Sequence, residues 1–465
     1  MTRVVLALVG AAAVAAAATA AFGRTAASGA AHDWPLYGYD AARHSVSPDA
    51  RITAANVGGL RRLRVRLDGT VDSAPIYVAG GVRGRDAFVV TTTYGRTEAL
   101  DADSGRVLWR FTPPSYASLA GSYRITNATP ALASDRRAVY AAAPDGRIRK
   151  LRLSDGRVLW TTRITLDPTH EKITSSLNVS RGLVLATTGG YIGDAPPYQG
   201  HVVSMSERTG VVAHVWNSLC SDRSRLIVPS TCGSSDSAIW SRNGAAVDPA
   251  TGDLVVATGN APFDGRTDWG DSVLVLSPDA SRLLRHYTPA DHDHLNSADL
   301  DLGSTSPALL PGGLALQGGK DGKLRLLDLR RLPGATAATG GEVQVVPTPG
   351  SRMMFSEPAI YQGKWALIST DGGTQGWLLR GRRLHQVWSN AFGGTSPVVV
   401  GGLLYVAGNG AVKVYRPTTG RQVATLDTGD VHWQSPIVAD GRVAIAEGNA
   451  NEHATSGVLD VFRLP

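Results

Sequence analysis

Residues 101–109 (Asp-Ala-Asp-Ser-Gly-Arg-Val-Leu-Trp) and 153–160 (Leu-Ser-Asp-Gly-Arg-Val-Leu-Trp) are two copies of one pattern. In each copy a turn rich in Asp, Ser and Gly joins two apolar stretches, and a tryptophan follows the glycine by four residues. Turn residues between short apolar runs are typical of antiparallel strands. Looser copies at residues 207–216 and 416–426 show that the unit recurs, so the sequence predicts a repeat protein made of strands.

A second pattern marks the start of each repeat: small residues with Ser, Thr and Pro stand directly before an apolar strand. A sheet of four strands has two apolar faces, and stacking the repeats in a closed ring buries both. We therefore predict an all-β fold, a single eight-bladed β-propeller with tryptophan-docked blades, or seven blades if two weaker repeats merge. The clear copies are Ser73–Tyr77, Ala128–Leu132, Ser306–Leu309, Glu357–Ile360, Ser396–Val399 and Ser435–Val438, and the weaker ones start near Ser175 and Ser237.

The amino-terminal region is expected to have two roles. Arg3, an apolar run over residues 4–22 and small residues ending at Ala31 predict a secretory signal peptide over residues 1–31. We expect a secreted, extracellular protein with no membrane span after cleavage, and a propeller over residues 32–465. Residues 32–39 are strand-like, and we expect them to complete the last blade beside residues 458–463.

The composition limits the classes of partner that the protein can be expected to bind. With 43% hydrophobic and 18% charged residues, 53 glycines and 25 prolines, the composition is that of a packed chain rich in turns. Its 46 basic and 39 acidic residues are scattered, so no nucleic-acid partner is indicated. In an exported chain, the only two cysteines, Cys220 and Cys232, predict a disulfide across one long loop.

Three stretches resemble the pyrroloquinoline-quinone (PQQ)-dependent alcohol dehydrogenases. These are the opening at residues 33–60, the tryptophan repeats, and the segment from Val247 to Ser272 that contains Thr258-Gly259-Asn260. The chain is more similar to the short, haem-free, polyvinyl-alcohol dehydrogenase-like members than to the methanol dehydrogenases. The resemblance implies a quinone and a calcium ion at the propeller axis, with an aspartate that removes a proton while hydride moves to the quinone.

The resemblance also implies site residues, position by position. Asn260 matches the metal-binding asparagine, and either Asp299 or Asp301 matches the catalytic aspartate. Lys320, in Gly-Lys-Asp-Gly, matches the cation that contacts the quinone. Two further residues match cofactor contacts: Thr174 through its hydroxyl, and Trp240 as a flat floor under the quinone.

Two family residues are missing. Tyr191 follows Gly189-Gly190 where the family has a metal-binding glutamate, and Ala128 follows Asn127 where it has an arginine. Two hypotheses therefore stay open. The first is a quinoprotein dehydrogenase that oxidises an alcohol, a sugar-like small molecule or a polymer. The second is a binding or scaffolding propeller without cofactor that holds a protein partner on its loop face.

Overall fold

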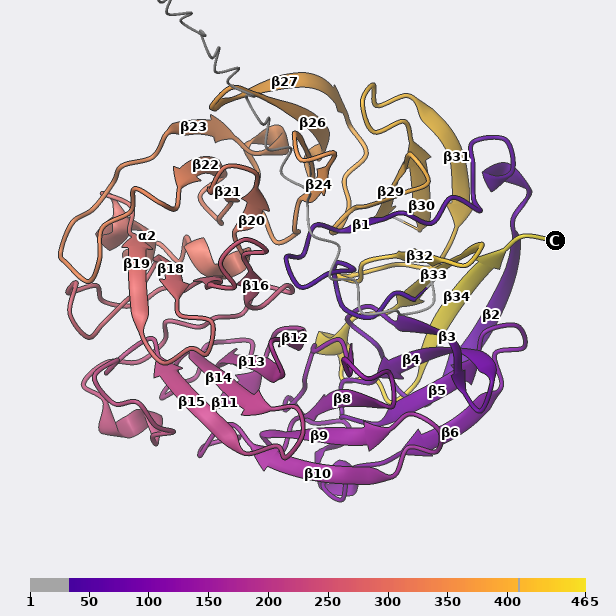
Figure 1. Cartoon of the computed structure of the whole chain (residues 1–465), viewed down its shortest axis with the longest axis horizontal. Coiled ribbons are helices and arrows are strands. Elements are labelled where there is room, and N and C mark those ends of the chain that lie inside the picture. Colours follow the sequence, from indigo (N-terminus) through magenta and orange to yellow (C-terminus); the bar gives the residue numbers. More distant parts are fainter. Residues whose placement is uncertain (1–32, 409) are drawn as a thin grey trace, which may run out of the picture.

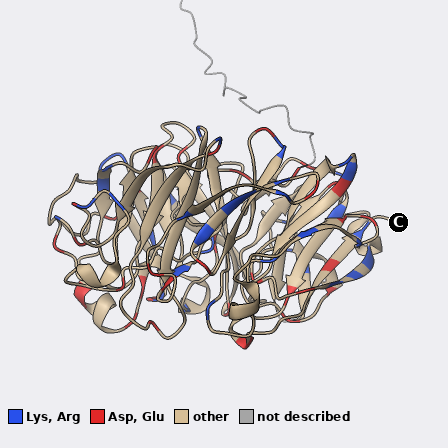
Figure 2. Ribbon diagram, turned by 90° about the horizontal axis from the view of Figure 1, so that it is seen from below, with Lys and Arg blue, Asp and Glu red and all other residues tan. Residues whose placement is uncertain are grey.

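Eight small sheets surround a common axis, as the sequence predicts (Figure 1), and their strands pair antiparallel except for one short parallel pair. The computed structural model describes residues 33–408 and 410–465, so the predicted signal peptide lies outside the described residues. Figure 2 shows the strands from the side, with basic and acidic positions interspersed over the blades. Within the described residues, no helix is long and apolar enough to cross a lipid bilayer.

We number the blades in chain order. Blade 1 contains β3 (Ile76–Val82), β4 (Arg85–Thr91), β5 (Thr97–Asp101) and β6 (Val107–Phe111); blade 2 contains β7 (Ala131–Leu132), β8 (Ala138–Ala143), β9 (Arg147–Arg152) and β10 (Val158–Arg163); blade 3 contains β11 (Glu171–Ile173), β12 (Asn178–Ser180), β13 (Leu183–Gly190), β14 (His201–Ser206) and β15 (Val212–Asn217); blade 4 contains β16 (Ala246–Val247), β17 (Leu254–Ala257), β18 (Val273–Leu276) and β19 (Leu283–Tyr287).

The second half of the ring continues in the same way. Blade 5 contains β20 (Ala308–Leu310), β21 (Leu314–Gln317), β22 (Lys323–Asp328) and β23 (Gln344–Pro347); blade 6 contains β24 (Ala359–Tyr361), β25 (Trp365–Thr370), β26 (Gly373–Arg380) and β27 (Arg383–Asn390); blade 7 contains β28 (Val398–Val400), β29 (Leu403–Gly408), β30 (Ala411–Tyr415), β31 (Gln422–Asp427) and β1 (Val46–Ser47); blade 8 contains β32 (Ile437–Ala439), β33 (Arg442–Glu447), β34 (Gly457–Arg463) and β2 (Arg61–Leu67). Helical segments are short: α1 (Tyr116–Leu119), α2 (His292–Ser297), and single 3-10 turns at Val57–Gly59, Pro229–Thr231, Leu302–Ser304, Pro349–Ser351 and Ala450–Glu452.

The repeated tryptophan docks one blade onto the next. In blade 1, Trp109 Nε1 donates to the carbonyl of Leu153 in blade 2 at 2.7 Å. Its ring covers Gly156, where a Cβ would lie 2.5 Å from the indole. Two further tryptophans repeat this arrangement. Trp160 covers Gly210 and Trp388 covers Gly420. Each indole can contact the neighbouring turn because the glycine there has no side chain.

The ring is closed by a different segment from the one the sequence suggested. Strand β2 pairs with β34 along its whole length, from Arg61 opposite Arg463 to Leu67 opposite Gly457. The expectation that residues 32–39 complete the last blade is therefore wrong, although the amino-terminal part of the chain does close the ring. The alternating pattern of Arg61–Leu67, with exposed arginines beside buried Val65 and Leu67, is that of an outer strand.

Residues 33–47 instead cross the centre of the ring, where Figure 1 shows the indigo segment leading into β1. Main-chain carbonyls of this segment accept hydrogen bonds from the innermost strands of separate blades. Arg43 is 1% exposed and donates to the carbonyls of Tyr37, Ser176 and Leu177. The main-chain hydrogen bonds run from the N–H of an inner-strand residue to a carbonyl of the segment, with N–O distances of 2.9–3.0 Å. They are Tyr77 to Trp34, Leu132 to Pro35, Val247 to Ala41, Ile360 to His44 and Val399 to Ser45.

The docking of Trp109 can be tested with Gly156→Ala. Gly156 has φ +74°, so alanine meets both backbone strain and the indole ring, at about 2–4 kcal/mol of unfolding free energy. Gly182 is a matched control because it has φ +75° and no atom within 4 Å of the place that a Cβ would take, so Gly182→Ala costs only the strain. Urea unfolding measures both variants. Equal losses of stability would contradict docking of the indole onto Gly156.

Candidate functional site

A cavity of about 530 Å³ opens at the axis among the segments that lead into the inner strands. All six residues singled out from the sequence line it: Thr174, Trp240, Asn260, Asp299, Asp301 and Lys320. Thr174 lies between β11 and β12, and Trp240, Asp299 and Asp301 stand in the segments before blades 4 and 5. Asn260 and Lys320 follow β17 and β21. The fold thus brings together residues that are as much as 146 positions apart in the chain.

Lys320 and two aspartates form the most polar part of the cavity. The ammonium of Lys320 lies 2.6 Å from Asp299 Oδ1 and 2.5 Å from Asp301 Oδ2. Asn260 fixes both carboxylates, because its side-chain amide donates to Asp299 Oδ1 at 2.9 Å and its backbone N–H to Asp301 Oδ1 at 2.8 Å. Gly259 permits this packing, since any Cβ there would collide with Asp301.

The two aspartates differ in environment. The side chain of Asp301 is 10% exposed and both of its oxygens are engaged, whereas that of Asp299 is 70% exposed. Burial raises the pKa of Asp301 although Lys320 opposes it, and burial lowers the pKa of Lys320 but the aspartates outweigh it and leave it raised. Among the described residues, Asp299 Oδ2 has no hydrogen-bond partner, so it is the carboxylate oxygen available to a ligand.

Aromatic rings form one wall of the cavity. The ring of Trp240 lies 6.1 Å from that of Phe355 and 6.2 Å from that of Trp433, and the rings of Phe355 and Trp433 stack 5.4 Å apart. The ammonium of Lys320 lies 5.5 Å from the centre of the Trp240 ring. A flat ligand could therefore contact indole faces and the Lys320–aspartate cluster at the same time.

Thr174 and Asn260 contribute differently to the wall. The hydroxyl of Thr174 lies 3.0 Å from the carbonyl of Ile239, to which it donates, so it helps to hold the segment that carries Trp240. Asn260 Oδ1 is buried and accepts no hydrogen bond from the described residues. A buried carbonyl oxygen of this kind is open to a cation or a hydroxyl group of a ligand.

The donor set falls short of a calcium site. Calcium binds six to eight oxygen ligands. Residues 33–408 and 410–465 contain no group of three His, Cys, Asp or Glu side chains placed to hold a metal ion. At the position of the absent glutamate, Tyr191 donates its hydroxyl to the carbonyl of Pro168 at 3.0 Å. The ammonium of Lys320 balances the carboxylates, so these residues do not fit calcium.

Sequence reasoning missed several residues of the cavity, including Lys172, Arg242, Phe355 and Trp433. One signal was available in the repeat itself. The residue three positions before the repeat proline is Asn127, Phe355 and Trp433 in three of the blades, and each lines the cavity. The phase of the repeat therefore marks positions that face the axis.

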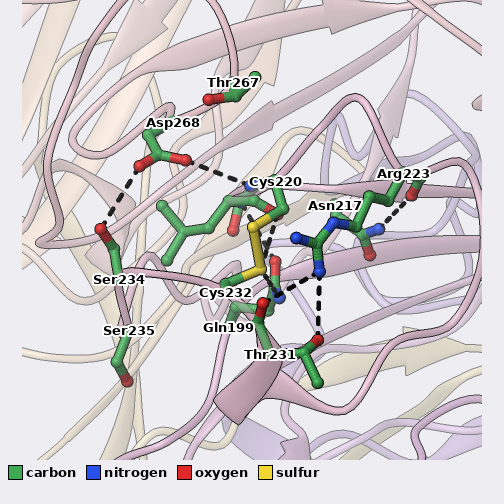
Figure 3. Close-up of a disulfide and its surroundings, with 12 residues drawn as sticks. Gln199, Asn217, Cys220, Arg223, Thr231, Cys232, Ser234, Ser235, Thr267 and Asp268 are labelled. Atoms are coloured by element: carbon green, nitrogen blue, oxygen red, sulfur yellow. Dashed lines mark hydrogen bonds between the residues drawn. A yellow bond between two sulfur atoms is a disulfide. The ribbon is translucent and has the colours of Figure 1, made fainter.

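The predicted disulfide joins Cys220 to Cys232 (Figure 3). It closes the loop that precedes Asp236, Ala238 and Trp240 in the cavity wall. Asp268 holds the same loop through the backbone N–H of Cys220 at 3.2 Å and the hydroxyl of Ser234 at 3.4 Å. The disulfide thus limits the conformational freedom of a segment that leads to Trp240 in the aromatic wall of the cavity.

A family model for PQQ repeats, described as "Outer membrane protein assembly factor BamB", matches residues 12–253. The chain belongs to this family. Curated relatives of this PQQ propeller include quinohemoprotein alcohol dehydrogenase ADH IIB of Pseudomonas putida, 26% identical over 64% of this chain and 46% of that protein. Another is 1-butanol dehydrogenase (cytochrome c) of Thauera butanivorans, 25% identical over 64% and 46%. The matches span about half the length of these relatives.

Solved structures confirm the fold. A europium-containing methanol dehydrogenase superposes with a TM-score of 0.69 at 18% identity, covering 93% of this chain and 98% of that one. BamB from Moraxella catarrhalis gives a TM-score of 0.55 at 12% identity, covering 87% and 98%. At these identities the likeness establishes the propeller architecture alone.

The Lys320 cluster predicts a pH-dependent loss of stability in Lys320→Met. Without the ammonium, the buried Asp301 has no cation beside it, and its pKa rises further above the value in the unfolded chain. Stability is then retained at low pH, where Asp301 is protonated, and lost as pH rises through the folded-state pKa. We expect a loss of about 3 kcal/mol at pH 8 and a smaller one at pH 5.

Chemical denaturation at the two pH values measures this effect. The double variant Lys320→Met/Asp301→Asn is the control, because it removes the buried charge and should recover most of the stability at pH 8. A loss in Lys320→Met that is the same at both pH values would show that Lys320 does not balance Asp301.

Proposed function

We propose that this protein is a quinoprotein dehydrogenase that binds a flat PQQ-type quinone in the axial cavity and oxidises an alcohol or sugar-like substrate. The observation that supports this most is the convergence of Trp240, Lys320 and the aspartate pair on one cavity. The relatives named as alcohol dehydrogenases support the same reaction class. Secretion stays a prediction from the signal-peptide sequence. A polymer stays the alternative to a small-molecule substrate.

The cavity residues fit a quinone in three respects. Trp240, Phe355 and Trp433 offer ring faces, Lys320 offers a donor for a carbonyl oxygen, and Asn260 Oδ1 offers an unused acceptor. When bound, the quinone would supply the acceptor for a hydride. The chain's own residues would hold it flat and exclude water from the reacting edge.

Asp299 is the better placed of the two candidate bases. Its Oδ2 is free among the described residues, and Oδ1 is held by Lys320 and Asn260, so the carboxylate is oriented and remains reachable. It would accept the hydroxyl proton of the substrate. Asp301 has both oxygens engaged and would act as a positioning residue that keeps the Lys320 ammonium in place.

Binding of PQQ tests the proposal directly. A ligand present at one hundred times its Kd should stabilise the folded chain by about 2.7 kcal/mol and raise its Tm. The Asn260→Ala/Lys320→Ala double variant should lose this shift, while Lys364→Met, an exposed lysine in blade 6, should keep it. No shift in the wild-type protein at saturating PQQ would contradict the proposed function and leave the cofactor-free binding propeller as the alternative.

The role of Asp299 is tested by separating binding from turnover. Asp299→Asn should bind PQQ with an unchanged thermal shift, yet lose about 10²- to 10⁴-fold in kcat with an artificial electron acceptor. Asp301→Asn should change stability and PQQ affinity more than Asp299→Asn does, because Asp301 holds Lys320. Full turnover in Asp299→Asn would show that another group accepts the proton.

A further inference from the structure

The cavity contains two more cationic side chains in addition to Lys320. Lys172 in β11 and Arg242 before β16 both line the cavity, although neither belongs to the Lys320 cluster. The guanidinium of Arg242 lies 4.6 Å from the centre of the Trp433 ring. Trp433 in turn lies 6.2 Å from Trp240, and the ammonium of Lys320 lies 5.5 Å from the centre of the Trp240 ring. The aromatic wall therefore has positive charge at both of its ends.

One buried carboxylate, that of Asp72, lies beside these two cations. Asp72 is 1% exposed and lies 3.7 Å from Arg242. It also accepts from His432 Nδ1 at 2.8 Å, from the side-chain amide of Asn127 at 3.2 Å and from the backbone N–H of Ala450 at 3.1 Å. Burial would raise the pKa of Asp72, but Arg242 and His432 outweigh burial and lower it to about 2, so Asp72 is an anion at neutral pH.

Lys172 is left without an anion of its own. Its ammonium makes no hydrogen bond or ion pair within 33–408 and 410–465, and the charges that act on it are Arg242 and Asp72. Burial and then Arg242 lower the pKa of Lys172 to about 7, while Asp72 opposes them. With one carboxylate for two cations, this end of the cavity has an excess positive charge whenever Lys172 is protonated.

We propose that Lys172 and Arg242 form an anion subsite that binds a carboxylate group of the cavity's ligand. The proposal deepens the proposed function and rests on it for the identity of that ligand. A carboxylate fits better than a point-like anion, because guanidinium groups pair with planar carboxylates and Arg242 lies over an indole beside which an aromatic acid can pack. The carboxylate belongs either to the quinone or to an acidic substrate.

Binding at this subsite takes up a proton. A carboxylate favours the ammonium form of Lys172 and raises its pKa, so protein at pH 7.5 that holds a neutral Lys172 must gain a proton when the anion binds. Affinity should therefore fall as pH rises above about 7. Arg242 and Lys320 keep their charge over this range, so Lys172 is the cation of the subsite expected to take up the proton, and Lys172→Arg tests this assignment.

The probe we would use is quinoline-2,4-dicarboxylate, with its uncharged diamide as the comparison. Calorimetric titration of the full chain at pH 7.5, in buffers with different ionisation enthalpies, gives both affinity and proton uptake. We expect the dicarboxylate to bind with proton uptake and at least tenfold more tightly than the diamide. Lys172→Met should weaken it at least tenfold, Lys172→Arg should keep the affinity without proton uptake, and Lys364→Met should behave as wild type.

Equal binding of dicarboxylate and diamide, or unchanged affinity in Lys172→Met, would overturn the subsite. If Lys172→Met fails to fold, the proton uptake of the wild type and of Lys172→Arg decides instead. Preloading with PQQ separates the two sources: competition assigns the subsite to the quinone, and simultaneous binding assigns it to an acidic substrate. A probe that binds in protein with no PQQ shift would leave the subsite standing and remove the proposed function.

Discussion

The structure depends on main-chain hydrogen bonds between a single central segment and the inner strands of the blades. Residues 33–47 place their carbonyls where inner-strand N–H groups would otherwise be buried without acceptors. Five blades donate to the segment in this way, and the buried guanidinium of Arg43 donates in return to two carbonyls of blade 3, those of Ser176 and Leu177. An unpaired buried N–H costs about 1–3 kcal/mol, so the segment and the inner strands specify each other.

This arrangement also explains where the site lies. The segment bonds to the inner strands themselves, whereas several cavity residues precede those strands in the chain, as Asn127 precedes β7 and Trp433 precedes β32. The inner strands thereby bind the main chain of the central segment, and the loops around them are left to form the cavity. Because these side chains come from different blades, their chemistry can change without changing the fold, which is consistent with a family match described by an assembly factor and relatives named as dehydrogenases.

Much of the fold could be predicted from the sequence, because the repeat shows it several times. Gly156 with Trp160, and the prolines before six of the inner strands, predict the order of the blades and a number of eight or seven. The eight sheets of the structure decide that number. The closing strand could not be assigned with the same certainty. Residues 32–39 and 61–67 both have strand-like patterns, and only the long-range pairing of β2 with β34 decides between them.

The site was predictable where a local motif carried it. Asn260, Asp299, Asp301 and Lys320 stand in recognisable short stretches, and the fold brings them together. Lys172 and Arg242 have no such motif. Their significance comes from what surrounds them, namely one shared carboxylate and an aromatic neighbour, and burial and pairing of that kind arise only in the folded chain.

The most direct test of the proposed quinone site is a crystal structure of the protein soaked with PQQ. We expect quinone density in the axial cavity, flat against Trp240, with one edge at Lys320 and Asp299 and a carboxylate within hydrogen-bond distance of Lys172 or Arg242. Density elsewhere on the propeller, or an empty cavity at full soaking concentration, would contradict the claim that these converging residues form a quinone site.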